Sequence, residues 1–302
     1  MICIYHRAVA GAAAAAVLAL AACSSTGVAG PAEPPVGEVP TLLASVGLRL
    51  PVEDYLQTTE QGDRLGAARL VLIRRCMARF GIDYTVKPLP ASGYGPRSLT
   101  DRRYGITDLA LARTAGYGLG PRDPKLAARP ERPKIGPDGQ TVLSGRGRSV
   151  VNGLPVPDGG CIAEADRALD QVVPAGTDVR IGNQLQLRTF EVSRNDSRVR
   201  AAFAAWSACM SGSGYLYDDP LTVMGDPAFT GEDPAHAGRP SPAELAVAAA
   251  DIGCKARTNL VGIWFTVESA YQRREIDPDR ARFVAAREAI AARDRAAAAI
   301  GG

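Results

Sequence analysis

Apolar residues recur at helical spacing in several stretches of the chain, so the sequence predicts a mainly α-helical fold. The first such stretch runs from Asp63 to Phe80 and stops before Gly81, a residue that commonly ends helices. Five side chains would share its apolar face, and they are Leu65, Leu70, Ile73, Met77 and Phe80. Shorter helices are expected from Thr107 or Asp108 to Arg113, and over residues 162–172.

The helical pattern is clearer in the second half of the chain. Asp196 or Ser197 can cap a helix that runs to Met210. The residues Ser241-Pro242-Ala243-Glu244 combine a capping box with proline at the first helical position. The apolar stripe that follows predicts one long helix to about Arg274. A last helix is expected over residues 278–300, with a solvated outer side because charges lie on most of its faces.

Strand signals are short and few. Residues 42–56 suggest a strand interrupted by Pro51, and residues 141–143 suggest another. Between Val151 and Leu154 stands Asn152-Gly153, the usual two-residue hairpin signal. Most of residues 91–160, with an exposed loop over 120–134, and the Asp-, Pro- and Gly-rich residues 217–241 are expected to form long irregular loops.

These patterns predict one mainly helical domain over residues 41–302, with a small β-hairpin. Inside it we expect two weakly similar halves, residues 41–175 and 190–276, followed by the C-terminal helix 278–300. The similarity is a repeated device. Cys76-Met77 and Cys209-Met210 each end a helix, and Gly160-Cys161 and Gly253-Cys254 each precede a small helix-forming residue.

The first 23 residues have the order of an export signal. His6 and Arg7 precede an unbroken run of apolar residues and glycine that is too short to span a membrane, and Leu20-Ala21-Ala22-Cys23 ends it. This ending resembles the lipobox of bacterial lipoproteins. The resemblance implies that Cys23 carries the lipid, such as a palmitoyl chain, and becomes the first residue of the mature chain. An ordinary cleaved signal with an incidental Cys23 is the alternative. Residues 23–40, rich in Ser, Gly, Pro and Ala, predict a disordered tether.

An exported chain with an even number of remaining cysteines is expected to form disulfides, because the compartment oxidises thiols. Four cysteines allow three pairings. The repeated device favours Cys76 with Cys161 and Cys209 with Cys254. The alternative is that the two Cys-Met pairs bind copper, which disulfide formation would prevent by removing the thiolates. The spacing of a zinc site is missing, so no metal is expected.

The body of the chain resembles uncharacterised exported lipoproteins of high-GC Gram-positive bacteria. The likeness spans roughly residues 50–275 and rests on the Cys-Met helix end, on Arg103-Tyr104-Gly105-Ile106-Thr107-Asp108 and on Val151-Asn152-Gly153-Leu154-Pro155-Val156-Pro157 leading into Gly159-Gly160-Cys161. It implies no activity.

Catalytic chemistry is hard to find in the sequence. The formal net charge is +3, and +2 without Arg7, so nucleic acid is not an expected partner. No G-x-S-x-G elbow, Walker loop or dinucleotide-binding motif occurs, and no cofactor is expected. His236, near Asp226 and Asp233, lies in a Pro- and Gly-rich loop. Asp218, Asp219 and Asp226 lack the spacing of a calcium loop.

Two groups of aromatic residues are candidate ligand-binding residues. Trp264, Glu268 and Tyr271 would share one side of a helix, where an exposed trio could stack on a sugar or peptide. If they are buried instead, they are core residues and Glu268 needs an arginine partner. The Tyr-Gly pairs between residues 94 and 118 could form a binding rim or close loops over the core.

The sequence therefore predicts a lipoprotein anchored through Cys23 on the extracytoplasmic face of the cell membrane. Its expected role is binding or structural, with an envelope protein or the cell wall as possible partner. The alternative is a secreted hydrolase that uses His236 or a carboxylate pair. A transporter's solute-binding lipoprotein would need repeated βαβ units, which the sequence does not suggest.

Overall fold

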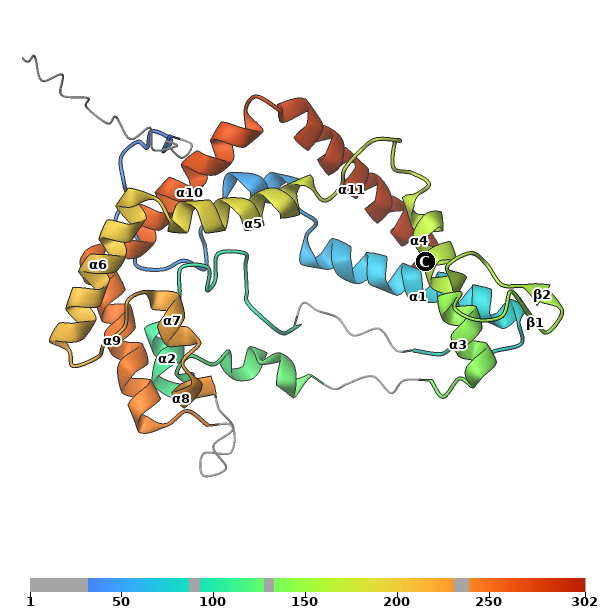
Figure 1. Ribbon diagram of the computed structural model, residues 1–302, viewed down its shortest axis with the longest axis horizontal. Helices are drawn as coiled ribbons and strands as arrows, with labels where there is room; N and C mark the ends of the chain where they lie inside the picture. The colour runs from blue at the N-terminus through green and yellow to red at the C-terminus, as the bar shows by residue number, and fades with distance from the viewer. Residues whose placement is uncertain (1–31, 87–92, 128–132, 231–238, 302) are drawn as a thin grey trace, which may run out of the picture. The chain divides into compact units, whose positions relative to one another are not determined.

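The computed structural model describes residues 32–86, 93–127, 133–230 and 239–301. Cys23 and His236 lie outside these residues. Within them the predicted fold class is confirmed, because the chain is mainly helical, with two disulfides and a two-stranded antiparallel hairpin (Figure 1). In this part of the chain no helix combines the length and the apolar character that a membrane span requires.

One group of elements, which we name the hairpin region, surrounds the first disulfide. It consists of α1 (Thr59–Arg79), α3 (Pro137–Ser144), β1 (Val150–Val151), β2 (Leu154–Pro155) and α4 (Gly160–Asp170). Its core is small and apolar, and Ile73, Met77, Phe80 and Val142 are all buried there.

The predicted hairpin turn is confirmed. Asn152 and Gly153 have φ of 49° and 76°, and Val151 pairs with Leu154 in the register that a two-residue turn produces. The Asn152 side chain also donates a hydrogen bond to the carbonyl oxygen of Phe80, at 2.7 Å. The turn is therefore tied to the end of α1.

A second group, which we name the cavity region, surrounds the second disulfide. Its helices are α2 (Leu109–Ala115), α5 (Ile181–Arg194), α6 (Ser197–Gly212), α7 (Pro220–Met224), α8 (Pro227–Thr230), α9 (Pro242–Thr258) and α10 (Leu260–Ile276). The described residues also form the short 3-10 helices η1 (Pro51–Tyr55), η3 (Gly120–Arg122) and η4 (Pro124–Leu126). The large core of this region is built around Trp206 and Trp264, neither of which is exposed.

The C-terminal helix α11 (Arg280–Gly301) joins the two regions (Figure 1). Near its start, Phe283 packs against Tyr55 of η1, with ring centroids 5.2 Å apart. Toward its end, Ala297 packs with Ala68 of α1 and Leu169 of α4. The buried side of α11 is thus formed largely by small and apolar residues.

Both predicted disulfide pairings are confirmed. Cys76 pairs with Cys161 and Cys209 with Cys254, with Cα atoms 5.6 Å apart in each bridge. Cys76 and Cys209 lie in the last turn of α1 and of α6, as the repeat predicts. The repeat is incomplete, however. Cys161 opens α4, whereas Cys254 lies in the last part of α9.

The predicted halves do not correspond to separate cores. Tyr104, Ile106, Ala112 and Tyr117 precede residue 175, yet they pack in the core of the cavity region. A helix-to-helix contact explains this, because α2 packs against α9. The first half therefore contributes to both regions.

The prediction of one helix from Pro242 to about Arg274 is wrong. The chain ends α9 at Thr258 and begins α10 at Leu260, because Asn259 adopts the left-handed conformation with φ of 49°. Asparagine tolerates this conformation better than most residues. Its side chain donates to the carbonyl of Pro40 and accepts from the N–H of Leu42, both at 3.0 Å.

The same contacts correct the extent of the tether. Pro34 is buried, Val36 packs against the core, and the Pro40 carbonyl lies where a side chain on Gly262 would stand. Residues from Pro34 onward belong to the folded unit. The predicted tether, residues 23–40, is therefore too long. Backbone contacts hold residues 34–42 on α10, and the composition of this stretch does not reveal them.

Two predicted strands are also wrong. Residues 141–143 lie in α3, which has Pro137 in its first turn and a left-handed Gly145 after its end. Proline and glycine at these positions favour a helix. Residues 42–56 contain η1 rather than a strand, because Pro51 begins a 3-10 turn there. Helix α5 was not predicted at all.

Candidate functional site

A partly enclosed cavity lies beside residues 97–108, which we name the cavity segment. Its volume is about 260 Å³, and it is half-open to solvent. Most of its wall is apolar, formed by the cavity segment, α2 and the residues that follow α2, including Ile106, Leu111, Ala112, Leu119 and Pro121. The lining also includes three arginines and two aspartates, which are Arg97, Arg102, Arg122, Asp101 and Asp108.

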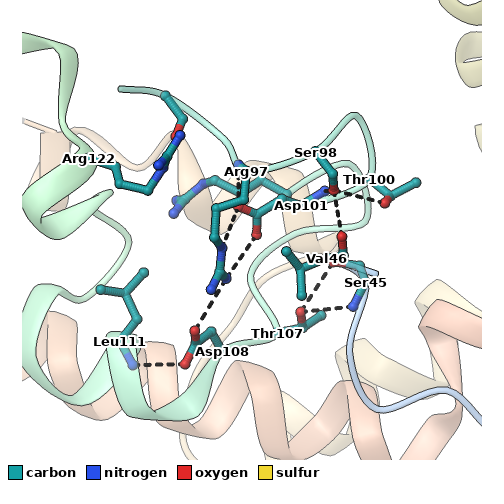
Figure 2. A network of polar contacts seen from close by, with 12 residues as sticks. Ser45, Val46, Arg97, Ser98, Thr100, Asp101, Thr107, Asp108, Leu111 and Arg122 are labelled. Carbon is teal, nitrogen blue, oxygen red and sulfur yellow. Dashed lines mark hydrogen bonds and ion pairs between the residues drawn. The ribbon is translucent and has the colours of Figure 1, made fainter. Parts of the chain in front are cut away.

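The two aspartates share one arginine. Arg97 donates from Nε to Oδ2 of Asp101 at 3.1 Å and from Nη2 to Oδ2 of Asp108 at 3.3 Å. Figure 2 shows Arg97 lying between them, while Asp108 also caps α2 by accepting from the Leu111 N–H at 3.0 Å. Burial raises the pKa of the Asp101 carboxyl, but hydrogen bonds from Arg97 outweigh it and hold that pKa below its ordinary value.

Arg102 is held differently. Its guanidinium donates to the backbone carbonyls of Tyr117 and Gly118, and the described residues place no carboxylate within hydrogen-bond distance of it. Burial lowers the pKa of Arg102, opposed by the nearby charge of Asp101. Arg122 donates from Nε to the carbonyl of Gly95 at 2.9 Å. Arg102 and Arg122 are thus both held by backbone carbonyl groups of the described residues.

Hydrogen bonds outside the cavity fix the cavity segment in place. Ser98 donates to the carbonyl of Val46 at 2.7 Å (Figure 2). Thr100 donates to the carbonyl of Leu48 at 2.9 Å. The Thr107 hydroxyl accepts from the Ser45 N–H at 3.2 Å. Residues 45–48 form a turn, closed by the Leu48 N–H and the Ser45 carbonyl, and this turn supports the cavity segment.

A buried ion pair lies behind the segment. Lys255 and Asp251 have side chains 2% and 0% exposed, with Nζ and Oδ2 2.7 Å apart. Lys255 also donates to the carbonyl of Ile106 at 3.1 Å, and Trp206 donates to Asp251 at 2.9 Å. Burial lowers the pKa of Lys255 and raises that of Asp251, and each charge opposes the shift of the other. The pair is inaccessible, so its role is to hold Ile106 and α9 together.

A second buried pair anchors the start of the motif at residues 103–108. Arg103 donates from Nε to Oε2 of Glu268 at 2.9 Å, and Tyr104 donates to the same oxygen at 2.9 Å. The Glu268 side chain is fully buried. Gln186 accepts from Arg103 at 2.9 Å, so the guanidinium is held from two helices.

The predicted aromatic trio shares Glu268 with the Arg103–Glu268 pair and is buried. Trp264, Glu268 and Tyr271 are 0%, 0% and 3% exposed, so they are core residues and form no exposed stacking platform. The arginine partner that a buried Glu268 requires is Arg103. Tyr104 and Tyr117 are buried as well, so the binding rim suggested by the Tyr-Gly pairs is not formed by these two residues.

Two of the aspartates considered for a calcium site bind the starts of helices. Asp219 and Asp226 bind the backbone N–H groups at the starts of α7 and α8. Among the residues that the structure describes, no three His, Cys, Asp or Glu side chains are grouped as a metal site. His236 cannot be placed, since it lies outside those residues.

Sequence reasoning did not single out Arg97, Asp101, Arg102 or Arg122. Charged residues in a Gly-rich loop have no periodicity that would reveal a shared cavity. The motif at residues 103–108 was the available signal, because it stands at the centre of this arrangement. A scan against protein-family models, a search of curated proteins and a search of solved structures each find no match to this chain.

Proposed function

We propose that this protein is an exported, lipid-anchored protein of the cell envelope that binds a small molecule in the cavity beside residues 97–108. The lipobox-like Leu20-Ala21-Ala22-Cys23 supports the anchor. One observation carries the binding role. A partly enclosed, largely apolar cavity with a few charged groups is the usual form of a small-molecule site.

The rigidity of the surroundings supports the same proposal. A site that keeps its shape without ligand loses less entropy when the ligand binds. Here the cavity segment is held by Ser45, Val46 and Leu48 on one side and by Lys255 and Glu268 on the other. Such a wall is ordered before any ligand arrives.

A hydrolase is the less favoured function. The carboxylate pair at the cavity is Asp101 and Asp108, and both bind Arg97. A general acid needs a raised pKa, whereas the pKa of Asp101 is lowered. This arrangement suits an ionised, positioning carboxylate better than a proton donor.

Thermal unfolding with three probes of one chain length tests the binding role. Octanoate, octanol and octylamine each have about ten or fewer non-hydrogen atoms. A 150 Å³ protein cavity holds benzene, so 260 Å³ accommodates roughly ten non-hydrogen atoms. The measurement uses the full-length Cys23→Ala chain, because a chain without a lipid needs no detergent. At least one probe should raise its Tm, and Ala112→Leu, which fills the cavity, should abolish that rise.

Leu111→Trp provides a second cavity-filling variant if Ala112→Leu does not fold, because Leu111 is only half-buried. If no probe raises the Tm, or if both filled variants respond as the parent does, the binding role is wrong. The anchor has its own test. The wild-type chain should fractionate with membranes and incorporate labelled fatty acid, while Cys23→Ala should do neither. Unlabelled wild-type protein would contradict the anchor.

A further inference from the structure

We propose that the ligand of this cavity is a small monoanion with an apolar body, such as a medium-chain or aromatic carboxylate, and that Arg102 binds its charge. This inference rests on the proposed binding function and specifies its ligand class. Three features of the cavity carry it, namely its charge balance, the position of Arg102 and its size.

The charge balance of the lining sets the charge of the ligand. Asp101 and Asp108 both bind Arg97, and neither is bonded to Arg102. Within the described residues Arg102 donates only to carbonyl oxygens, so no carboxylate is bonded to it. One anionic group would supply a counter-charge, whereas a dianion such as a phosphate monoester would bring a second negative charge close to two carboxylates.

Among the arginines of the cavity, Arg102 has the surroundings that best suit the anionic group of a ligand. Its two bonds to the carbonyls of Tyr117 and Gly118 fix the guanidinium but supply no negative charge. A guanidinium has five N–H donors, so three remain after these two bonds. Burial has already removed part of the water around this charge. A carboxylate that binds it would replace that water with a charge-assisted hydrogen bond.

The rest of the lining sets the body of the ligand. Ile106, Leu111, Ala112 and Leu119 offer apolar contacts and no charge. Burying a methylene group stabilises a complex by about 0.8 kcal/mol, so a short alkyl chain or one ring suffices for measurable affinity. The volume of about 260 Å³ limits the enclosed part to roughly ten non-hydrogen atoms. Octanoate meets both limits.

Isothermal titration calorimetry with the same three probes tests the ligand class on the full-length Cys23→Ala chain. Octanoate should bind at least about tenfold more tightly than octanol, because a hydrogen bond to a charged group contributes more than a neutral one. Octylamine should bind most weakly, because its ammonium meets Arg102. This comparison needs no further variant, so it stands even if substitutions at Arg102 fail to fold.

Variants at Arg102 test whether this residue binds the carboxylate of the ligand. Arg102→Gln should weaken octanoate binding about tenfold or more and leave octanol binding unchanged, while Arg102→Lys should retain part of the preference for octanoate. Arg113→Gln is the matched control. It removes one arginine from α2, at an exposed position that does not line the cavity, and should change neither affinity.

The outcomes separate this inference from the function on which it rests. If octanol or octylamine binds as tightly as octanoate, and Ala112→Leu removes that binding, the ligand class is wrong and the binding function stands. Octanoate binding that Arg102→Gln leaves unchanged would remove Arg102 from its role. If none of the three probes binds, both proposals fail.

Discussion

The hairpin region and the cavity region are each closed by one disulfide with the same Cα separation, yet their interiors differ in kind. The hairpin region buries apolar side chains around Cys76 and Cys161. The cavity region buries Lys255, Asp251 and Glu268 as well. Buried charges are costly unless they are paired and hydrogen-bonded.

The difference points to the cavity as the part of the molecule that sets the proposed ligand specificity. Two buried ion pairs among the described residues of the cavity region hold one segment. Glu268 binds Arg103 and Tyr104, and Lys255 binds the carbonyl of Ile106. That segment forms one wall of the cavity. In the hairpin region the described ion pairs lie near the surface, as Arg69 and Asp166 do. We infer that the polar core of the cavity region exists to shape the cavity.

The disulfides have the largest expected effects. Replacing Cys76 and Cys161 by alanine should lower the free energy of unfolding by about 4 to 5 kcal/mol, because that bridge spans 85 residues. Replacing Cys209 and Cys254, a span of 45 residues, should cost about 4 kcal/mol. Urea denaturation gives both values. Hydrogen exchange should rise mainly in the region that loses its bridge, and an even rise in both regions would contradict their description as distinct.

Removing one partner of an ion pair should distinguish the regions next. Lys255→Met leaves Asp251 buried with its charge uncompensated and should cost about 3 to 5 kcal/mol. Arg69→Met breaks the Asp166 pair of the hairpin region, where both side chains are more than a third exposed, and should cost about 0 to 1 kcal/mol. Urea midpoints of the two variants measure this contrast. Equal losses would mean that burial does not separate the pairs.

Alanine substitutions at two glycines should give a smaller difference in stability, because only one of the two positions lacks space for a side chain. Gly105 and Gly153 both have positive φ, of 82° and 76°. A Cβ atom on Gly105 would stand 2.4 Å from Nζ of Lys255, whereas one on Gly153 meets nothing within 4 Å. Gly153→Ala should cost about 1 to 2 kcal/mol for its conformation alone. Gly105→Ala should cost about 1 to 3 kcal/mol more in thermal unfolding, because it displaces the buried amine.

Acid titration should produce the smallest difference. The folded pKa of Asp101 lies below the unfolded value of about 3.9, so its stabilisation is complete above that pH and is lost as the pH falls through the folded pKa. Asp101→Asn should therefore flatten the fall in stability below pH 4. Asp166→Asn should do so less, because its pair with Arg69 is more exposed. If the stability of Asp101→Asn falls more steeply with acid than that of the parent, this prediction is contradicted.

Much of the fold could be predicted from the sequence, because local signals specify it. Helical periodicity and caps located α1, α6 and the start of α9, and Asn152-Gly153 located the hairpin. The errors occur where tertiary contacts decide the conformation. Asn259 interrupts a continuous apolar stripe because its side chain binds the backbone at residues 40 and 42.

The candidate site was less predictable for the same physical reason. Glu268 could be assigned an arginine partner in principle, but that partner is 165 residues away in the sequence. Similarly, Glu244 was expected to complete a capping box, and its carboxylate instead accepts from the N–H of Tyr117 at 2.9 Å. Polar partners so distant leave no periodic pattern, so the cavity emerges only from the three-dimensional arrangement.

Chemical-shift mapping with octanoate tests the central claim most directly. In the isotope-labelled, full-length Cys23→Ala chain, the account predicts that added octanoate shifts the backbone amide signals of residues 106–116, 119, 120 and 122. The signals of the hairpin at residues 150–155 should stay unchanged. The largest shifts should disappear in Ala112→Leu. Shifts concentrated in the hairpin region, or none at saturating octanoate, would contradict the assignment of the cavity as the functional site.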